Sequence, residues 1–344
     1  MVDPIQLINR KGNSVNVKKN SANPPLVSII IPVYNGERHI KFTLQSSMDQ
    51  TYRNIEIIVV NDGSTDGSLS IIEDCQQIDN RILCLSKENE GLVLARKTGL
   101  SKASGKYIQH LDADDTLLPD AIERLARRAE ETNADIVAAP FYFCSSGKEP
   151  KLSGLLKFEE VSGLDYYREI LNQRAYWSVW SNFHKRSLYE DNPIQALPHV
   201  SFGEDLILIT QLALYAHKAA SIQEPILNYN QHETSMTYQM NNAKYLQLRM
   251  GQDWVSNYLD SKGLGLIFRK EMAQMHLQTT FDSFRWKQFS HAKQDMKKLI
   301  PMIDEFPDLI SLLSRRERKL FSSYKKSPLL GELRLKYYRW KGKM

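Results

Sequence analysis

Short β-rich runs, most of them apolar in the middle, recur along the first part of the chain. They lie at 27–33, 56–60, 81–85, 106–111 and 135–139. Their spacing is roughly 25 residues, and amphipathic segments separate them, as βαβ crossovers require. Runs that are apolar on both faces are typical of strands in a sheet covered by helices. The pattern predicts an α/β fold that begins near residue 26.

The pattern changes twice farther along the chain. Between about residues 140 and 204, aromatic residues are scattered among turns with one helical piece, and we expect this region to face a substrate. Beyond about residue 241 the apolar spacing becomes helical, which predicts helices at 243–259, 268–284 and 288–300. We therefore expect a flexible leader over 1–25, an α/β domain over 26–240 and a helical domain over 241–344.

Composition agrees with a globular protein that has a sizeable core, since 42% of the 344 residues are hydrophobic and 25% are charged. No stretch approaches the roughly 20 apolar residues of a membrane helix, and the amino end lacks the apolar region of a signal peptide. These features predict a cytoplasmic protein. Cys75, Cys84 and Cys144 have no Cys-x-x-Cys spacing, so we expect buried, reduced thiols.

The net charge of +5 is concentrated at the carboxy-terminal end. Residues 315–344 carry eleven Lys or Arg against two Glu, hence +9, which leaves −4 for the rest of the chain. A charge placed in a tail argues against a nucleic-acid-binding fold. With its interspersed aromatic residues, the basic tail is expected to contact an anionic membrane at the inner face of the plasma membrane. A solvated helix face is the alternative.

Three carboxylates follow the fourth apolar run directly, in the motif LDADD at 111–115. Left alone, Asp112, Asp114 and Asp115 would repel one another. Oxygen ligands at the end of a strand, beside a nucleotide diphosphate, suit a hard divalent cation such as Mg²⁺ or Mn²⁺. A solvated loop before the helix that begins near Pro119 is the alternative.

Polar residues also follow the first two runs, at the edge where open α/β sheets bind ligands. The segment PVYNGE at 32–37 ends the first run, and its Tyr34 could stack on a nucleobase. Asp62 ends the second run and could accept hydrogen bonds from a base edge, while Ser64 or Thr65 caps the next helix. A plain turn is the alternative, and it explains the glycine and serine better than it explains Asp62.

Weaker signals lie elsewhere. Arg96, on a predicted helix, could contact phosphates or the acidic loop, although surface helices carry such residues routinely. Glu204 and Asp205 precede a buried helix, so either helix capping or general-base chemistry fits them. His232 could reach a phosphate or help a metal, or have no role. No Walker loop, GxGxxG motif or nucleophile elbow is present, which argues against NTPases, dehydrogenases and hydrolases.

Together, four blocks resemble family 2 of the inverting glycosyltransferases with the GT-A fold, of the bacterial capsule and exopolysaccharide type. The blocks are SIIIPVYN at 28–35, VNDGSTD at 60–66, LDADD at 111–115 and GED at 203–205. The resemblance implies a Rossmann-like mixed sheet in a catalytic domain over 26–240. It also implies transfer of a sugar from a nucleotide-diphosphate donor, most commonly UDP, to a saccharide or lipid-linked saccharide acceptor.

The resemblance assigns roles to individual residues. Asp205 matches the catalytic base, and Asp114 matches the ligand of Mn²⁺ or Mg²⁺. Trp180, Glu204 and His232 fall on the acceptor or phosphate side. The residues implied in nucleotide binding are Pro32, Tyr34, Asn35, Glu37, Asp62, Arg96, Asp112 and Ala113.

The sequence also departs from the family pattern. Lys97 stands where relatives usually carry asparagine, and Gln231 stands where many carry arginine. The Gln-x-x-Arg-Trp motif of processive relatives is reduced to Arg285 and Trp286, which predicts a single addition. An inactive protein of the same fold that binds nucleotide sugars or carbohydrates remains the alternative.

Overall fold

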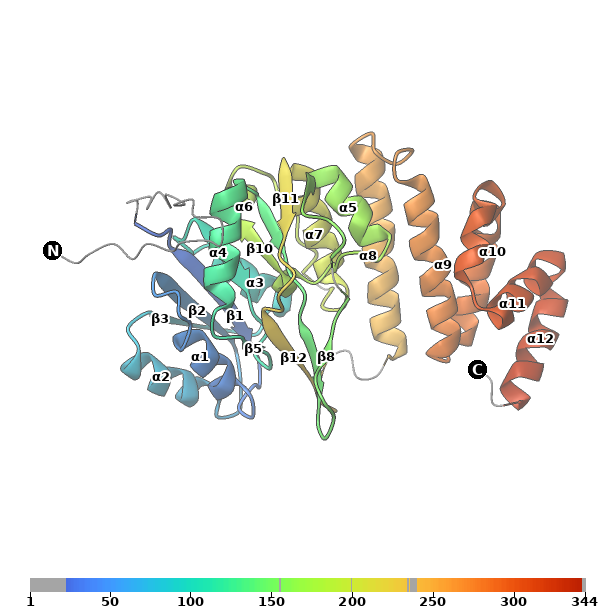
Figure 1. Cartoon of the computed structure of the whole chain (residues 1–344). Helices are drawn as coiled ribbons and strands as arrows, with labels where there is room; N and C mark the ends of the chain where they lie inside the picture. The colour runs from blue at the N-terminus through green and yellow to red at the C-terminus, as the bar shows by residue number, and fades with distance from the viewer. Residues whose placement is uncertain (1–22, 155, 199, 234, 236–239, 342–344) are drawn as a thin grey trace, which may run out of the picture.

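The structure is a computed structural model that describes residues 23–341, apart from 155, 199, 234 and 236–239 (Figure 1). The predicted leader therefore lies almost wholly outside the described residues. At its end, the carbonyl of Pro24 accepts a hydrogen bond from Asn54 Nδ2 (2.7 Å), and that of Pro25 accepts one from the Tyr52 hydroxyl (2.6 Å). The chain is thus attached to the fold from Pro24 onward.

An eight-stranded mixed sheet forms the centre of the α/β part, in the order β3-β2-β1-β4-β10-β6-β11-β9. Its strands are β1 (Val27–Val33), β2 (Ile55–Asp62), β3 (Ile82–Lys87), β4 (Tyr107–His110), β6 (Ile136–Ala138), β9 (Glu160–Ser162), β10 (Asn182–Lys185) and β11 (Lys218–Ser221). The first four are parallel, whereas β10 runs antiparallel to both β4 and β6. All five predicted runs are strands of this sheet, so the α/β prediction is confirmed.

A second sheet, in the order β5-β12-β7-β8, lies beside the first. Its strands are β5 (Thr116–Leu117), β7 (Tyr142–Ser145), β8 (Lys151–Leu152) and β12 (Leu227–Gln231). Because β12 pairs with β5, residues near 230 lie next to the acidic motif. The expectation of turns and one helical piece over 140–204 is wrong, because β7 to β10 fall there. Strands of two to four residues are too short to show the alternation of apolar and polar residues that predicts a strand.

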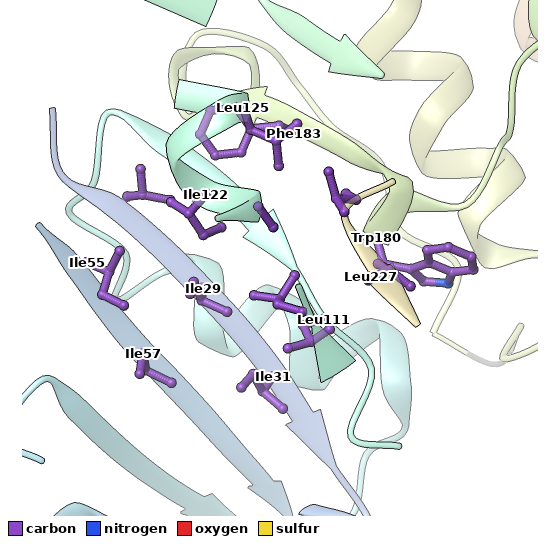
Figure 2. Close-up of a cluster of buried hydrophobic side chains, with 14 of the residues drawn as sticks. Ile29, Ile31, Ile55, Ile57, Leu111, Ile122, Leu125, Trp180, Phe183 and Leu227 are labelled. Carbon is purple, nitrogen blue, oxygen red and sulfur yellow. The ribbon is translucent and has the colours of Figure 1, made fainter. Parts of the chain in front are cut away.

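Helices cover both faces of the main sheet. They are α1 (Ile40–Met48), α2 (Ser68–Ile78), α3 (Leu92–Leu100), α4 (Ala121–Thr132), α5 (Gly163–Leu171), α6 (Ser187–Glu190) and α7 (Glu204–Tyr215). Figure 2 shows Ile29 and Ile57 in one cluster with Ile122 of α4, whereas Ile58 packs with Ala95 of α3. Burial on both faces explains why these strands read as continuous apolar runs.

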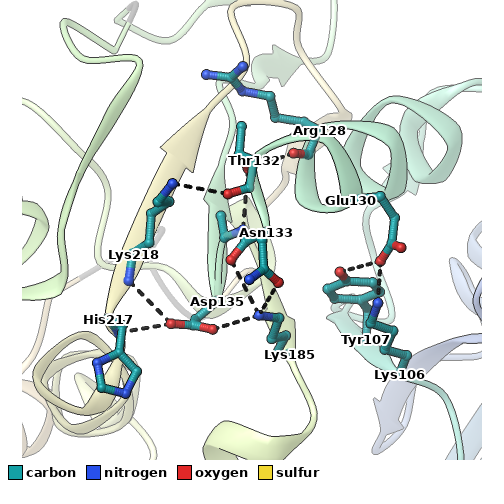
Figure 3. A network of polar contacts seen from close by, with 11 residues as sticks. Lys106, Tyr107, Arg128, Glu130, Thr132, Asn133, Asp135, Lys185, His217 and Lys218 are labelled. Carbon is teal, nitrogen blue, oxygen red and sulfur yellow. Dashed lines mark hydrogen bonds and ion pairs between the residues drawn. The ribbon is translucent and has the colours of Figure 1, made fainter.

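A polar network fixes the reversed strand β10 beside β6 (Figure 3). The carboxylate of Asp135 accepts hydrogen bonds from Lys185 Nζ (2.9 Å) and from the backbone N–H groups of His217 (2.8 Å) and Lys218 (3.2 Å). One side chain thereby joins the start of β6 to β10 and β11. This contact helps to hold β6, β10 and β11 next to one another.

The helical part begins with α8 (Asn242–Ser261), α9 (Arg269–Arg285) and α10 (Phe289–Glu305), which confirms the three predicted helices. After a 3-10 helix, η2 (Pro307–Leu312), it ends with α11 (Arg315–Lys326) and α12 (Pro328–Trp340). Val255 of α8 belongs to the core that holds Ile209 of α7, whereas Leu277, Phe281 and Leu320 form a separate cluster. The last helices therefore extend away from the sheet (Figure 1).

Two simpler features complete the fold. In the described part of the chain, no helix is both long and apolar enough to cross a membrane. All three cysteines are free; Cys75 is buried as expected, but Cys84 and Cys144 are only partly buried, which corrects the prediction. Cys84 lies on β3, the edge strand of the main sheet, where neighbours cover one side less completely.

Candidate active site

A cleft of about 1770 Å³ opens at the carboxyl ends of β1, β2 and β4. Ligand pockets for one small molecule usually measure about 300–1000 Å³, so the cleft has room for two substrates. Of the residues predicted from sequence, Glu37 and Arg96 do not line it. Those that do are Pro32, Tyr34, Asn35, Asp62, Asp112, Ala113, Asp114, Trp180, Glu204, Asp205 and His232.

The loops after β1 and β2 are tied to each other. The backbone N–H of Asn35 donates to Ser64 Oγ (3.0 Å), and its side-chain carbonyl accepts from the Thr65 N–H (2.8 Å). Glu37 accepts from the Gly67 N–H (3.0 Å). The expectation that Ser64 or Thr65 caps α2 is wrong, because Gly67 is the N-cap and has no side-chain cap. Glu37 shapes the rim of the cleft from outside its lining.

Tyr34 and Asp62 occupy different positions in the cleft. Tyr34 is 55% exposed and lines the cleft, where its ring can meet a planar group such as a nucleobase. Asp62 is buried, and its carboxylate accepts the backbone N–H groups of Glu90 (3.1 Å) and Gly91 (2.8 Å), while Lys87 Nζ lies 3.3 Å away. In this structure Asp62 thus holds the loop after β3 in place, and its contact with a base edge stays a prediction.

The three carboxylates of the acidic motif have different surroundings. Asp115 is fully buried, and its Oδ1 accepts the backbone N–H of Asn230 (2.8 Å). Burial, with the charges of Asp114 and Asp112, raises the pKa of Asp115 well above its usual range. Asp115 therefore serves the fold, whereas Asp114 and Asp112 remain partly exposed to the cleft.

Two histidines meet at the carboxylate of Asp114. The Nε2 atom of His232 lies 2.9 Å from Asp114 Oδ2, and the imidazole stacks on His39 with ring centroids 4.3 Å apart. The pairing of β12 with β5 brings His232 to this place, so it is not an isolated surface histidine. Sequence reasoning missed His39, which precedes α1 and carries no local signal for the contact.

Arg96 lies at the centre of the acidic residues. One of its terminal nitrogens donates to Glu204 Oε1 (2.8 Å) and Asp205 Oδ1 (2.7 Å), and the other donates to Asp112 Oδ1 (2.9 Å). Only 5% of its side chain is exposed. The prediction that Arg96 contacts the acidic loop is therefore confirmed. The alternative, that Arg96 is an ordinary residue on the surface of a helix, is wrong. Its neighbour Lys97 does lie exposed.

The charges around Arg96 do not balance, because one guanidinium faces three carboxylates. Burial, and then the charges of Asp205 and Asp114, raise the pKa of Asp112 to about 6 against the opposing effect of Arg96. Burial, and then the charge of Asp205, raise the pKa of Glu204 well above its usual range. Asp112 and Glu204 therefore retain protons more strongly than exposed carboxylates do.

Asp205 is held by two elements rather than used as a helix cap. The N-cap of α7 is Gly203, whose φ of 87° suits glycine, and no side chain caps the helix. The Oδ2 atom of Asp205 accepts the backbone N–H of Val179 (3.2 Å), at the start of the 3-10 helix η1 (Val179–Ser181). Since Arg96 holds the other oxygen, the carboxylate has a fixed orientation at the cleft.

Aromatic side chains form a wall of the cleft near Asp205. The ring of Trp180 stacks on that of Tyr229 with centroids 5.2 Å apart. The ring of Phe141 packs edge-on against Trp180, with centroids 4.6 Å apart. Trp180 is largely buried, but it and Tyr229 both line the cleft. The segment after residue 176, with its tryptophans, thus provides a flat apolar surface beside the carboxylate.

A further part of the lining comes from the helical part, which sequence reasoning did not connect with the site. Lys244 of α8 and Gln278, Asp282 and Trp286 from α9 and its end line the cleft, together with Trp177. Amphipathic helices of this kind look alike in sequence, so no local signal marks these positions. The cleft therefore lies between the α/β part and the helices.

The donor atoms at Asp114 fit one kind of metal site. Within the described residues, no group of three or more His, Cys, Asp or Glu side chains is arranged to hold a metal ion by itself. Mg²⁺ is commonly bound through one or two carboxylates and completed by water and substrate phosphates. Asp114, with Asp112 nearby, therefore fits an ion that arrives with a diphosphate.

Comparison with known proteins identifies the class. A profile described as "Glycosyl transferase family 2" matches residues 28–197. An uncharacterized glycosyltransferase of Haemophilus influenzae is 33% identical over 202 residues, which are 58% of this chain and 79% of that relative. The chain belongs to glycosyltransferase family 2, which confirms the resemblance drawn from the four blocks.

Other relatives share the α/β part. The glycosyltransferase GlyA of Streptococcus pneumoniae is 31% identical over 226 residues, 61% of this chain and 31% of that relative. The uncharacterized glycosyltransferase EpsJ of Bacillus subtilis is 35% identical over 220 residues, 62% of this chain and 63% of that relative. The matches thus span less than two thirds of the length of GlyA and EpsJ.

A solved structure confirms the fold over nearly the whole chain. TarS 1–349 of S. aureus, in complex with UDP-GlcNAc, superposes with a TM-score of 0.69 at 19% identity. The superposition covers 92% of each chain, so it includes the helical part. The fold is therefore the GT-A fold with helices at the carboxy-terminal end, as predicted.

Proposed function

We propose that this protein is an inverting, metal-dependent glycosyltransferase that moves a sugar from a nucleotide-diphosphate donor, a UDP-sugar, to an acceptor hydroxyl. Its role is in the synthesis of bacterial surface polysaccharide. The observation that carries the proposal is the carboxylate of Asp205, fixed at the cleft by Arg96 and Val179 beside the acidic motif. Membership of family 2 supports the same activity.

In the proposed donor site, Tyr34 and Asp62 hold the nucleobase, with Pro32 and Asn35 shaping the loop. Asp112 and Ala113 lie by the ribose, and Asp114, with His232 behind it, holds Mn²⁺ or Mg²⁺. Such an ion supplies positive charge to the diphosphate leaving group. The TarS structures in complex with UDP-GlcNAc and with UDP support a donor of this class.

In the proposed reaction, Asp205 takes the proton of the acceptor hydroxyl as the oxygen attacks the anomeric carbon. The new bond forms on the face opposite the diphosphate, and the bond from the anomeric carbon to the diphosphate oxygen breaks, which inverts the carbon. Burial and the charge of Asp205 raise the pKa of Glu204, so Glu204 gives up its proton less readily than an exposed carboxylic acid does. Asp205, held at the cleft by Arg96 and Val179, is the proposed base.

The proposed acceptor is a saccharide, free or linked to a lipid. Sugars present apolar faces and polar edges, and the cleft offers both kinds of partner. Trp177, Trp180 and Trp286 provide apolar surface, while Gln278 and Asp282 provide hydrogen-bonding groups. The reduced processive motif at Arg285 and Trp286 supports addition of one sugar at a time.

The test is nucleotide binding and sugar transfer by Asp114→Ala. We expect the variant to lose metal-dependent binding of UDP, measured by calorimetry with and without Mn²⁺, and nearly all transfer. Its fold should persist, because Asp114 is partly exposed. Asp74→Ala, which alters an exposed carboxylate on α2, is the matched control.

Two results would contradict the proposal. Full transfer in excess chelator would exclude the metal. Binding of UDP-sugars without transfer or donor hydrolysis would favour an inactive binding protein of the same fold. A screen of nucleotide sugars for metal-dependent thermal stabilisation identifies the donor, since a ligand of the folded state raises its stability.

A further inference from the structure

The last two helices form a hairpin, α11–α12, at the end of the molecule opposite β3 (Figure 1). Gly331 makes their close packing feasible. A Cβ atom at this position would lie 2.3 Å from the ring of Tyr324, so only glycine lets α12 lie against that ring. Ser314 caps α11 in a capping box with Glu317. The hairpin is therefore a built element with a defined surface.

Six cations line a groove of about 1000 Å³ along the hairpin. They are Arg315, Arg316, Arg318, Lys319, Lys326 and Arg334. Among the residues that the structure describes, none of the six forms an ion pair with a carboxylate, whereas Lys325 next to them pairs with Asp304. The groove is therefore a strongly positive surface without internal compensation.

An apolar stripe on α12 adjoins this groove. It consists of Leu329, Leu330, Leu333, Tyr337 and Trp340, which are 47% to 76% exposed. At 3.6 residues per turn these positions fall within about 100° of the helix circumference. Arg334 and Lys336 border the stripe on its two sides. The outer face of α12 thus has the pattern of a helix that lies in a membrane interface.

We propose that the α11–α12 hairpin docks on a bilayer that contains anionic lipids. The cations meet the lipid phosphates, the aromatic rings sit at headgroup level, and the leucines enter the acyl boundary. A nucleic acid or a soluble polyanion would satisfy the cations but leave the leucines in water. The charge and the stripe together therefore favour a membrane.

The first experiment is sedimentation of the full chain with vesicles of phosphatidylcholine, alone or mixed with phosphatidylglycerol. We expect binding to the mixed vesicles that is about tenfold or more tighter and that weakens with salt. The variant Arg316→Glu/Lys319→Glu/Lys326→Glu should lose this preference. The control Lys41→Glu/Lys102→Glu/Arg127→Glu makes the same change in net charge on exposed cations of the α/β part and should keep it.

The second experiment tests the stripe. Leu333→Ser/Trp340→Ser should weaken vesicle binding and leave binding to dextran sulfate unchanged, with the fold confirmed by circular dichroism. Equal loss in the control triple variant, or full vesicle binding by Leu333→Ser/Trp340→Ser, would overturn the proposal. Dextran sulfate binding as tight as vesicle binding would assign the groove to a soluble polyanion instead. None of these readouts depends on sugar transfer.

Discussion

Arg96 beside the cleft and Arg316 on α11 carry the same charge in opposite surroundings. Arg96 is buried and donates to Asp112, Glu204 and Asp205, whereas Arg316 is exposed with no carboxylate partner among the described residues. A buried charge must be paired, since its lost hydration is costly. An exposed cation is hydrated and needs no partner within the protein. A cluster of such cations therefore indicates a binding partner outside the protein.

Positive charge has a different role in each of these two regions. Beside the cleft, one cation of α3 holds three acids that belong to the loop after β4 and to α7, and thereby fixes the geometry of the proposed chemistry. In the α11–α12 hairpin, no geometry depends on the six cations. Substitutions should therefore affect turnover and stability in the first region, and only binding to a surface in the second.

The largest effect is expected from Asp205→Asn. General-base assistance is typically worth about 10²- to 10⁴-fold in rate, so turnover should fall by that factor while the donor dissociation constant stays nearly unchanged. Asparagine keeps the shape of the side chain and one oxygen that can accept the N–H of Arg96 or of Val179, so the fold should persist. Steady-state transfer kinetics and calorimetric donor binding measure the two quantities.

Glu204→Gln is the control for this prediction. Glutamine keeps an oxygen that can accept the N–H of Arg96, so this variant should retain most of the turnover. Nearly normal turnover in Asp205→Asn, together with collapse in Glu204→Gln, would transfer the role of base to Glu204.

The next effect is on stability, from Arg96→Met. Breaking a buried ion pair on one side costs about 3–5 kcal/mol, because the remaining carboxylates lose their counter-charge. Arg316→Met, the matched change on the α11–α12 hairpin, should alter the free energy of unfolding by less than about 0.5 kcal/mol. Urea denaturation at neutral pH measures both. Similar values for the two variants would remove the contrast between the regions.

A smaller effect is expected in the pH dependence of stability. The pKa of Asp112 is raised from 3.8 to about 6, so between these values the folded state binds more protons than the unfolded chain. Asp112 therefore contributes about 1 to 3 kcal/mol to the free energy of unfolding below about pH 4. This contribution is lost as the pH rises to about 6. Unfolding free energies of the wild type and Asp112→Asn across this range should diverge accordingly. Parallel curves of unfolding free energy against pH for the two proteins would contradict the raised pKa of Asp112.

The smallest effect is expected within the helical part. Ser314 Oγ accepts the N–H of Glu317, and the Glu317 side chain accepts the N–H of Ser314 (2.8 Å). Ser314→Ala should lower the free energy of unfolding by about 1 kcal/mol, as loss of an N-cap typically does. Ser322→Ala, on the exposed face of α11, should have almost none of this effect. Equal melting curves for both variants would show that the capping box contributes nothing.

The sequence by itself determined the strands that are buried on both faces and the longer helices. Burial on both sides of β1 and β2 forces continuous apolar runs, and long helices repeat their period often enough to be recognised. It also placed the acidic motif, Tyr34 and Asp205 at element ends that face one cleft, since each follows a strand or begins a helix. These are local patterns with a direct physical cause.

Only the tertiary structure decided which of these residues meet. The burial of Arg96 among three carboxylates joins positions more than a hundred residues apart, and the stack of His39 on His232 depends on the pairing of β12 with β5. The contribution of α9 to the cleft arises in the same way. Contacts between distant segments leave no period or spacing in one sequence, because the energy that selects them is shared across the packed elements.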